Sequence, residues 1–323
     1  MNGAASGGVK VGLKTAPIRV AWSELESVWR RAGELGCFDS MWLYDHFYPN
    51  DGDGSCFEAF TSLAGLAHLV PDATVGHLVL ANPYRHPALV AKMATTLDHL
   101  TGGRFTLGLG AGWHVPETEA FGMELAPIGQ RLAELRSAIQ VIRAMFRPEA
   151  GVWPEADGMP SRSAGGVTLD APPFRLRHAR NDPLPVRPAG IPIWMGVQGE
   201  RVGLPLAAEL ADGWNFSGVG DIDDFRRKRA ILLGAADRFG RAPGAIEISA
   251  QLRVEPSKAD VGLALCTAFV EAGCEHVVLY LDPRAGPAGV EALATTIVEP
   301  LRARSSRLQA QRRKPAEDLR GPH

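Results

Sequence analysis

Short apolar runs alternate with longer amphipathic segments along most of this chain. The apolar runs have the length and the turn-rich flanks that are typical of buried parallel strands. Between them, apolar residues recur every three or four positions, as they do in helices that cover a sheet. Strands are predicted at residues 9–14, 40–44, 74–80, 104–108, 191–195, 213–216, 246–254 and 276–280, and helices at residues 23–35, 57–69, 87–100, 128–146, 200–210, 223–239, 258–272 and 289–304.

This alternation of strands and helices favours a closed (β/α)₈ barrel, a TIM barrel, over an open sheet. We therefore predict that residues 1–304 form a single barrel domain. In such a barrel the loops that follow the strands meet at one face, where binding and catalytic residues gather. Residues directly after a predicted strand are thus the first candidates for a functional site.

One segment, residues 147–190, interrupts the alternation. It is rich in proline and glycine and shows no sustained period, although residues 167–169 and 174–176 can form a short hairpin. A connection of this length in a compact domain is usually a functional loop or a flexible one. We predict an insertion over the barrel mouth and leave open whether it is a lid or a surface loop without a role.

Composition and charge limit the class of protein. Hydrophobic residues make up 46% of the chain, and no apolar run approaches the roughly 18–20 residues of a membrane span. Without a secretion-signal pattern or CxxC spacing, the four cysteines are expected to be free thiols in a cytoplasmic protein. Residues 302–323 hold seven Lys/Arg and two Asp/Glu but no aromatic residue. We therefore predict a disordered basic tail at residues 305–323 and no nucleic-acid partner.

Polar residues follow two of the predicted strands. Asp45 and His46 come after the second strand, where a histidine can transfer a proton near neutral pH and a carboxylate can orient it; a purely structural role is the alternative. Gly76 and His77 lie in the third strand, where glycine marks a bulge, a close approach to a ligand, or simple packing. Arg85 can pair with an anion or support its own loop.

Glycines follow two further strands. Residues 108–112 give GxGxG, and Trp113 holds the place where a dinucleotide fold requires its last glycine. These glycines still allow a flat ring to lie against bare backbone. Residues 196–199 (GVQG) open a predicted helix whose free N–H groups suit a phosphate, with Glu200 facing away.

Other chemistries lack their sequence signals. The chain has no HExxH or HxH spacing, so no metal site is predicted. It also has no GxSxG, the usual mark of a serine hydrolase, and no GxxxxGK[ST] loop for a nucleoside triphosphate.

Four segments carry a family resemblance: LGCFDSMWLYDHF, RHPALVAKMATTLDHLTGGRFTLGLGAGW, PIWMGVQGE and AELADGWN. Together they resemble the bacterial-luciferase-like family, especially its F420-dependent oxidoreductase branch, over residues 9–302. The resemblance implies a TIM barrel with an insertion over its mouth, a homodimer, and a flavin-type ring across the carboxyl ends of the strands.

The resemblance also implies roles for individual residues. His46 is the implied catalytic acid or base, and a non-proline cis peptide is implied between His77 and Leu78, against the ring. The cofactor-binding residues that it implies are Asp45, His77, Leu78, Leu80, Ala111, Gly112, Gly196, Val197, Gln198 and Gly199.

Three functions remain open at this point. The first is F420-dependent hydride transfer between the deazaflavin C5 and a small organic substrate. The second is an FMNH2-dependent monooxygenase that uses oxygen and a separate cofactor reductase, and the third is a non-catalytic flavin-binding protein. We favour the first because the DHF and GAGW segments look most like that branch. Sugar-phosphate oxidation is not predicted, since Asn50 and Trp113 replace a tryptophan and a catalytic glutamate of those family members.

Overall fold

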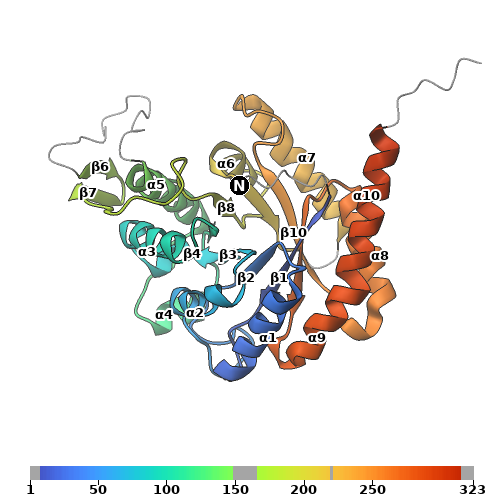
Figure 1. Cartoon of the computed structure of the whole chain (residues 1–323). Coiled ribbons are helices and arrows are strands. Elements are labelled where there is room, and N and C mark those ends of the chain that lie inside the picture. Colours follow the sequence, from blue (N-terminus) through green and yellow to red (C-terminus); the bar gives the residue numbers. More distant parts are fainter. Residues whose placement is uncertain (1–7, 148–165, 219–220, 314–323) are drawn as a thin grey trace, which may run out of the picture.

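The computed structural model describes residues 8–147, 166–218 and 221–313. Eight parallel strands in this part of the chain form a barrel surrounded by helices (Figure 1). Neighbouring strands follow the order β3-β2-β1-β11-β10-β9-β8-β5, and β3 also pairs with β5, which closes the ring. The barrel strands are β1 (Lys10–Thr15), β2 (Ser40–Leu43), β3 (Thr74–His77), β5 (Phe105–Gly110), β8 (Ile193–Met195), β9 (Gly213–Phe216), β10 (Glu247–Arg253) and β11 (His276–Leu281). The predicted closed barrel is confirmed.

The third predicted strand is divided in two. The first part is β3, and the second is the two-residue strand β4 (Leu80–Ala81), which pairs in parallel with the end of β5. Residues 78 and 79 lie between them, outside the ladder. The carboxyl end of this barrel strand therefore departs from regular pairing beside the face where a site is expected.

Helices cover the outside of the barrel. Their bounds are α1 (Trp22–Leu35), α2 (Ala59–Leu66), α3 (Pro87–Leu100), α4 (Val115–Ala120), α5 (Ile128–Phe146), α6 (Gly203–Leu210), α7 (Ile222–Arg238), α8 (Ala259–Glu271), α9 (Gly286–Leu293) and α10 (Glu299–Arg313). The short helix α4 was not predicted. None of the helices in the described ranges combines the length and the apolar character needed to cross a membrane.

Helix α10 contradicts part of the predicted tail. The chain was expected to be disordered from residue 305, but it is helical as far as Arg313. Ser305 is buried and its Oγ accepts a hydrogen bond from the Val9 backbone N–H at 3.1 Å. Arg302 pairs with Asp39 at 2.7 Å. These contacts attach the first half of the helix to the barrel, whereas composition alone suggested disorder; residues 314–323 lie outside the described part.

The middle of the barrel is filled by apolar side chains. Trp42, Leu78, Trp194 and Val278 form a buried cluster, and the two indole rings lie 5.0 Å apart. These residues come from β2, β8, β11 and the segment between β3 and β4, so the cluster spans the barrel. Their packing closes the interior below the carboxyl ends of the strands.

A chain of hydrogen bonds lies below this cluster, toward the amino-terminal ends of the strands. Trp42 Nε1 donates to Ser40 Oγ at 2.6 Å, and Ser40 Oγ lies 2.7 Å from His276 Nε2. The other ring nitrogen of His276 lies 3.0 Å from Glu247 Oε1. A Cβ at Gly12 would lie 2.2 Å from Ser40 Oγ, so this glycine makes room for the hydrogen-bonded chain.

The predicted hairpin inside the insertion is confirmed. Strands β6 (Val167–Ala171) and β7 (Phe174–Ala179) pair antiparallel and lie beside α5, at the edge of the molecule (Figure 1). Ser137 of α5 donates to the Pro172 carbonyl at 2.7 Å, which fixes the hairpin to that helix. The hairpin contributes no side chain to the cavity described below. Residues 148–165, to which the lid prediction also applies, lie outside the described residues.

Candidate active site

A cavity of about 450 Å³ opens at the carboxyl ends of the barrel strands. All but one of the predicted site residues line it. They come from loops that are distant in sequence, and the parallel strands bring them to one face. The predicted residues that line the cavity are Asp45, His46, Leu78, Leu80, Ala111, Gly112, Gly196, Val197, Gln198 and Gly199.

His77 is the exception. Side chains alternate along a strand, so His77 points to the outer side of the barrel while Gly76 and Leu78 point inward. Its Nε2 donates to the Ala59 carbonyl at 3.2 Å, and its ring packs between Phe60 and Phe105. Burial lowers the pKa of this imidazole to about 4, so it is neutral near pH 7. Its placement corrects the prediction of a cofactor contact, because the side chain faces away from the cavity.

The non-proline cis peptide lies between Leu78 and Val79, one residue later than the resemblance implied. Val79 packs against two of the cavity's glycines. A Cβ at Gly110 would lie 2.7 Å from Val79 Cγ2, and a Cβ at Gly196 would lie 2.9 Å from Val79 Cγ1. These glycines therefore make room for the segment between β3 and β4, whereas the sequence suggested space for a ring at Gly110 and a phosphate site at Gly196.

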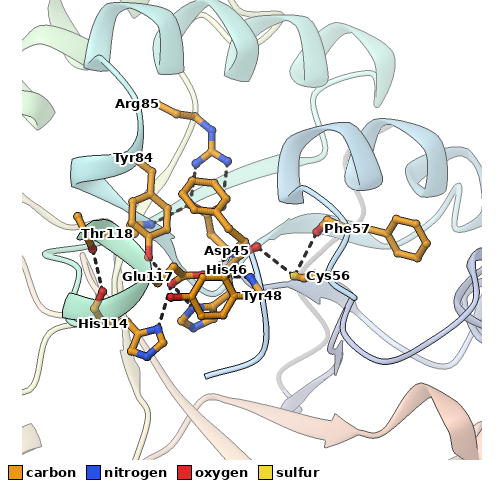
Figure 2. Close-up of polar contacts among 12 residues, drawn as sticks. Asp45, His46, Tyr48, Cys56, Phe57, Tyr84, Arg85, His114, Glu117 and Thr118 are labelled. Atoms are coloured by element: carbon orange, nitrogen blue, oxygen red, sulfur yellow. Dashed lines mark hydrogen bonds and ion pairs between the residues drawn. The ribbon is translucent and has the colours of Figure 1, made fainter. Parts of the chain in front are cut away.

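His46 is held by a carboxylate that was not predicted. Its Nδ1 lies 2.7 Å from Glu117 Oε2. Figure 2 shows the contact, which joins the loop after β2, where His46 lies, to helix α4, which carries Glu117. The Glu117 side chain is fully buried, whereas that of His46 is 16% exposed and lines the cavity. The arrangement fixes the imidazole at the cavity wall.

Glu117 accepts several further hydrogen bonds. The Phe47 backbone N–H and the Tyr84 hydroxyl donate to it, and the Tyr48 N–H donates at 3.3 Å. Burial alone would raise the pKa of this carboxyl, but the hydrogen bonds from His46, Tyr84 and Phe47 outweigh burial and lower it to about 2. Glu117 is therefore ionised near neutral pH, and we infer that His46 Nδ1 carries the proton that the pair shares.

Glu117 should make the stability of the protein sensitive to acid. Its pKa is depressed in the folded state, so its stabilising effect is present above its ordinary pKa and is lost as the pH falls toward 2. Between pH 5 and pH 3, we expect the free energy of unfolding to fall by about 2 kcal/mol more in wild type than in Glu117→Gln. Urea unfolding at both pH values measures this difference. Glu119→Gln, an exposed change in the same helix, should behave like wild type, and equal losses in all three proteins would contradict the assignment.

A second histidine approaches the same carboxylate. His114 Nδ1 lies 3.4 Å from Glu117 Oε2, and the donor atoms of His46, His114 and Glu117 all lie within 4.8 Å of one another. One metal ion can bridge such a spacing. However, the Glu117 oxygens already accept hydrogen bonds from the backbone and from Tyr84, so we interpret the group as a hydrogen-bond network around an ionised carboxylate. His114 and Glu117 are three residues apart, but tertiary packing brings His46 to them from 71 residues away.

Asp45 supports the wall next to His46. Its carboxylate pairs with Arg85 through two hydrogen bonds, at 2.6 and 2.9 Å, and accepts the Ala81 backbone N–H at 3.1 Å. Arg85 also pairs with Glu58. The guanidinium therefore supports its own loop, which was one of the two roles considered for it, and Figure 2 shows its pairing with Asp45. Asp45 also holds the Ala81 backbone, at the end of β4, beside the cavity.

The loop of residues 196–199 forms the next part of the wall. Helix α6 begins at Gly203, three residues later than predicted, and Glu200 turns away from the loop to pair with Arg227 at 2.9 Å. Gln198 Nε2 donates to the Asn215 carbonyl at 2.9 Å, whereas its buried Oε1 has no hydrogen-bond partner among the described residues. An unpaired buried oxygen at a cavity wall is suited to accept a hydrogen bond from a bound ligand.

Comparison with known proteins places these features in context. The family model described as luciferase-like monooxygenase matches residues 5–261. A 4-hydroxyprotoasukamycin monooxygenase of Streptomyces nodosus subsp. asukaensis is 32% identical over 63% of this chain and 51% of its own length. This chain thus spans about half of that relative.

Two further similarities concern a reductase and a dehydrogenase. A 5,10-methylenetetrahydromethanopterin reductase of Archaeoglobus fulgidus is 29% identical over 84% of this chain and 73% of its own length. The solved structure of an F420-dependent secondary alcohol dehydrogenase, in complex with an F420-acetone adduct, superposes with a TM-score of 0.72 at 18% identity. That superposition covers 91% of this chain and 99% of the dehydrogenase, and it shows a shared fold.

Proposed function

This chain belongs to the luciferase-like monooxygenase family, and from that premise we propose that it is an F420-dependent oxidoreductase. It transfers a hydride between the deazaflavin C5 and a small organic substrate, and His46 handles the accompanying proton. The relatives include F420-dependent enzymes as well as monooxygenases, so the choice of F420 belongs to the proposal. A homodimer and a separate cofactor reductase remain predictions.

The observation that carries the proposal is the pair formed by His46 and Glu117. The 2.7 Å contact directs the Nδ1 edge of the imidazole to an ionised carboxylate. This leaves Nε2 as the nitrogen that can exchange a proton with a substrate. A carboxylate in this position also stabilises the imidazole whenever it is protonated. The geometry suits a general acid or base at a cavity wall.

The cavity also has features that suit a flavin-type cofactor. Gln198 presents a buried oxygen that lacks a partner, and the backbone of residues 196–199 can approach a ligand closely because two of the four are glycines. When bound, the cofactor supplies or receives the hydride, while the protein orients it and excludes water. The residues that would hold it are Asp45, Leu78, Leu80, Ala111, Gly112, Gly196, Val197, Gln198 and Gly199.

The proposal does not extend to sugar phosphates. Asn50 and Trp113, which replace a tryptophan and a glutamate of the sugar-phosphate dehydrogenases, both line the cavity. Trp113 is 60% exposed and its ring lies 5.9 Å from that of His46, edge to face. The substrate would therefore meet an indole where those enzymes present a carboxylate.

A monooxygenase that uses FMNH2 and oxygen is the second candidate. The 32% identity to 4-hydroxyprotoasukamycin monooxygenase supports it. Both candidates need a flat ring in the same cavity, so the cavity alone does not separate them. They differ in whether oxygen is consumed.

Turnover assays separate the candidates. Reduced F420 is supplied without oxygen, together with a panel of compounds that carry activated C=C, C=N or C=O bonds, and formation of oxidised F420 is followed. A parallel reaction supplies FMNH2 from a reductase and follows oxygen uptake above the enzyme-free rate. We expect substrate-dependent oxidation in the first reaction. Oxygen uptake coupled to a hydroxylated product in the second would contradict the F420 proposal, and cofactor binding without turnover in either would indicate a non-catalytic protein.

A further inference from the structure

The cavity has two walls of different character. The predicted cofactor residues lie mainly after β3, β5 and β8, where glycine, alanine and aliphatic residues predominate. In the closed ring, β10, β11 and β1 are consecutive and are separated from those strands by β9 on one side and β2 on the other. They therefore form the opposite wall. The side chains that they contribute to the cavity are Lys14, Gln251, Arg253 and Tyr280.

Lys14 is a buried cation on this wall. The residue is 6% exposed and its ammonium donates to Gln251 Oε1 at 2.6 Å. The ammonium also lies over the rings of Tyr44 and Tyr280, at 5.0 and 5.9 Å from their centroids. Among the described residues, no carboxylate approaches within 4.0 Å of it. The groups that contact the ammonium are thus neutral, although a lysine is rarely buried without an ionic partner.

Arg253 is the second cation, two residues after Gln251 on β10. Its guanidinium lies 4.5 Å from the centroid of the Tyr280 ring. Among the described residues it too has no carboxylate within ion-pair distance, and the two acids of the neighbouring loops each pair with another arginine. Asp51 pairs with Arg19 at 2.9 Å, and Asp282 pairs with Arg284.

The two cations also repel each other. Burial, followed by the charge of Arg253, lowers the pKa of Lys14 to about 7. A bound anion would reverse both effects, because it would offset the repulsion and restore a partner to the ammonium. An anion-binding subsite requires neighbouring cations that are not already paired with a carboxylate of the protein, as these two are not.

We propose that Lys14 and Arg253 form a subsite for an anionic group of the substrate, so that the enzyme acts on small organic acids such as carboxylates. The inference rests on the proposed function only in assigning the glycine-containing wall to the cofactor. That assignment leaves the β10–β11–β1 wall to the substrate. Arg253 would bind the anion at the exposed rim, Lys14 would bind it at the cavity floor, and Tyr280 would lie beside both.

Binding of matched probes tests the subsite. Benzoate and its neutral isostere benzamide, with sulfate as a second anion, are titrated into wild type, Lys14→Met, Arg253→Gln and the control Lys10→Met, and heat is measured. Lys10 lies on the same strand outside the cavity. We expect wild type and Lys10→Met to bind benzoate at least tenfold more tightly than benzamide, and the other two variants to lose this preference. Lys14→Arg and Arg253→Lys should retain the preference for benzoate. Their behaviour distinguishes loss of the charge from loss of the fold.

The affinities for F420 and FMN are measured in the same proteins. We expect them to change less than threefold. A tenfold loss of cofactor affinity in Lys14→Met or Arg253→Gln would assign the cations to an anionic part of the cofactor and overturn the proposal. The proposed anion subsite would also be overturned if neither benzoate nor sulfate bound wild type more tightly than benzamide did. A protein that prefers benzoate but binds neither cofactor would retain the subsite and refute only the proposed function.

Discussion

Replacing His46 with glutamine is expected to lower kcat by about 10²–10⁴-fold and to change the dissociation constant of the cofactor by less than about threefold. The imidazole lines the cavity, but its Nδ1 contact is with Glu117, so its removal takes away a proton donor or acceptor and leaves the rest of the cavity wall in place. Turnover with the substrate found in the panel assay gives kcat, and fluorescence titration gives the cofactor affinity.

A nearby histidine provides the control for this variant. His114 also approaches Glu117 but does not line the cavity. His114→Gln is expected to keep kcat within about threefold of wild type, which is below the effect of removing an acid or base. Equal loss of turnover and cofactor affinity in the His46 variant would show that His46 supports binding and would remove the catalytic assignment.

The second large effect is a gain in stability. Lys14→Met is expected to raise the free energy of unfolding by about 4 kcal/mol at pH 7, because the folded protein no longer buries an ammonium without an acid partner. The folded-state pKa of Lys14 lies near 7, below its ordinary value of 10.5. The cost of burying the charge is therefore full below pH 7 and disappears as the pH approaches 10.5.

Urea unfolding at pH 7 and pH 9.5 tests the sign of this effect. The difference between Lys14→Met and wild type should shrink at the higher pH, where wild type has released the proton. Lys10→Met is the control, because the Lys10 side chain is 55% exposed and a surface pair contributes at most about 1 kcal/mol. A Lys14 variant less stable than wild type at pH 7 would show that the ammonium is already stabilised inside the fold. A residue that lowers stability in this way is typical of a functional site.

The sequence predicted the barrel because its strands and helices differ strongly in period. It also located His46 and the loop of residues 196–199, since both directly follow strands and such positions meet at one face. These predictions required only the order of the elements. The other predicted cavity residues, such as Leu78, Leu80 and Ala111, were implied by the family resemblance, and all of them except His77 line the cavity.

Details that depend on single residues were missed. His77 was assigned to the cavity although the alternation of side chains turns it outward, and the cis peptide lies one residue beyond the expected position. A shift of one residue along a strand reverses which face a side chain occupies, and the pattern of apolar residues in a buried parallel strand does not fix that register.

Glu117 was missed for a different reason. It lies 71 positions from His46 along the chain, on a helix of six residues that no periodic pattern marked. The only local signal was an acidic residue directly after Pro116, in the first turn of a helix. Contacts of this kind are determined by how α4 packs on the loop after β2, which a single sequence does not specify. The same holds for Lys14 and Arg253, whose proximity depends on the closure of the barrel.

We propose above all that the cavity binds a deazaflavin for hydride transfer. Equilibrium titration of the purified, cofactor-free protein with F420 and with FMN, followed by fluorescence, tests it most directly. We expect a dissociation constant for F420 at least tenfold lower than that for FMN. Tighter binding of FMN would favour the monooxygenase, and binding of neither would contradict the assignment of the cavity to a flavin-type cofactor.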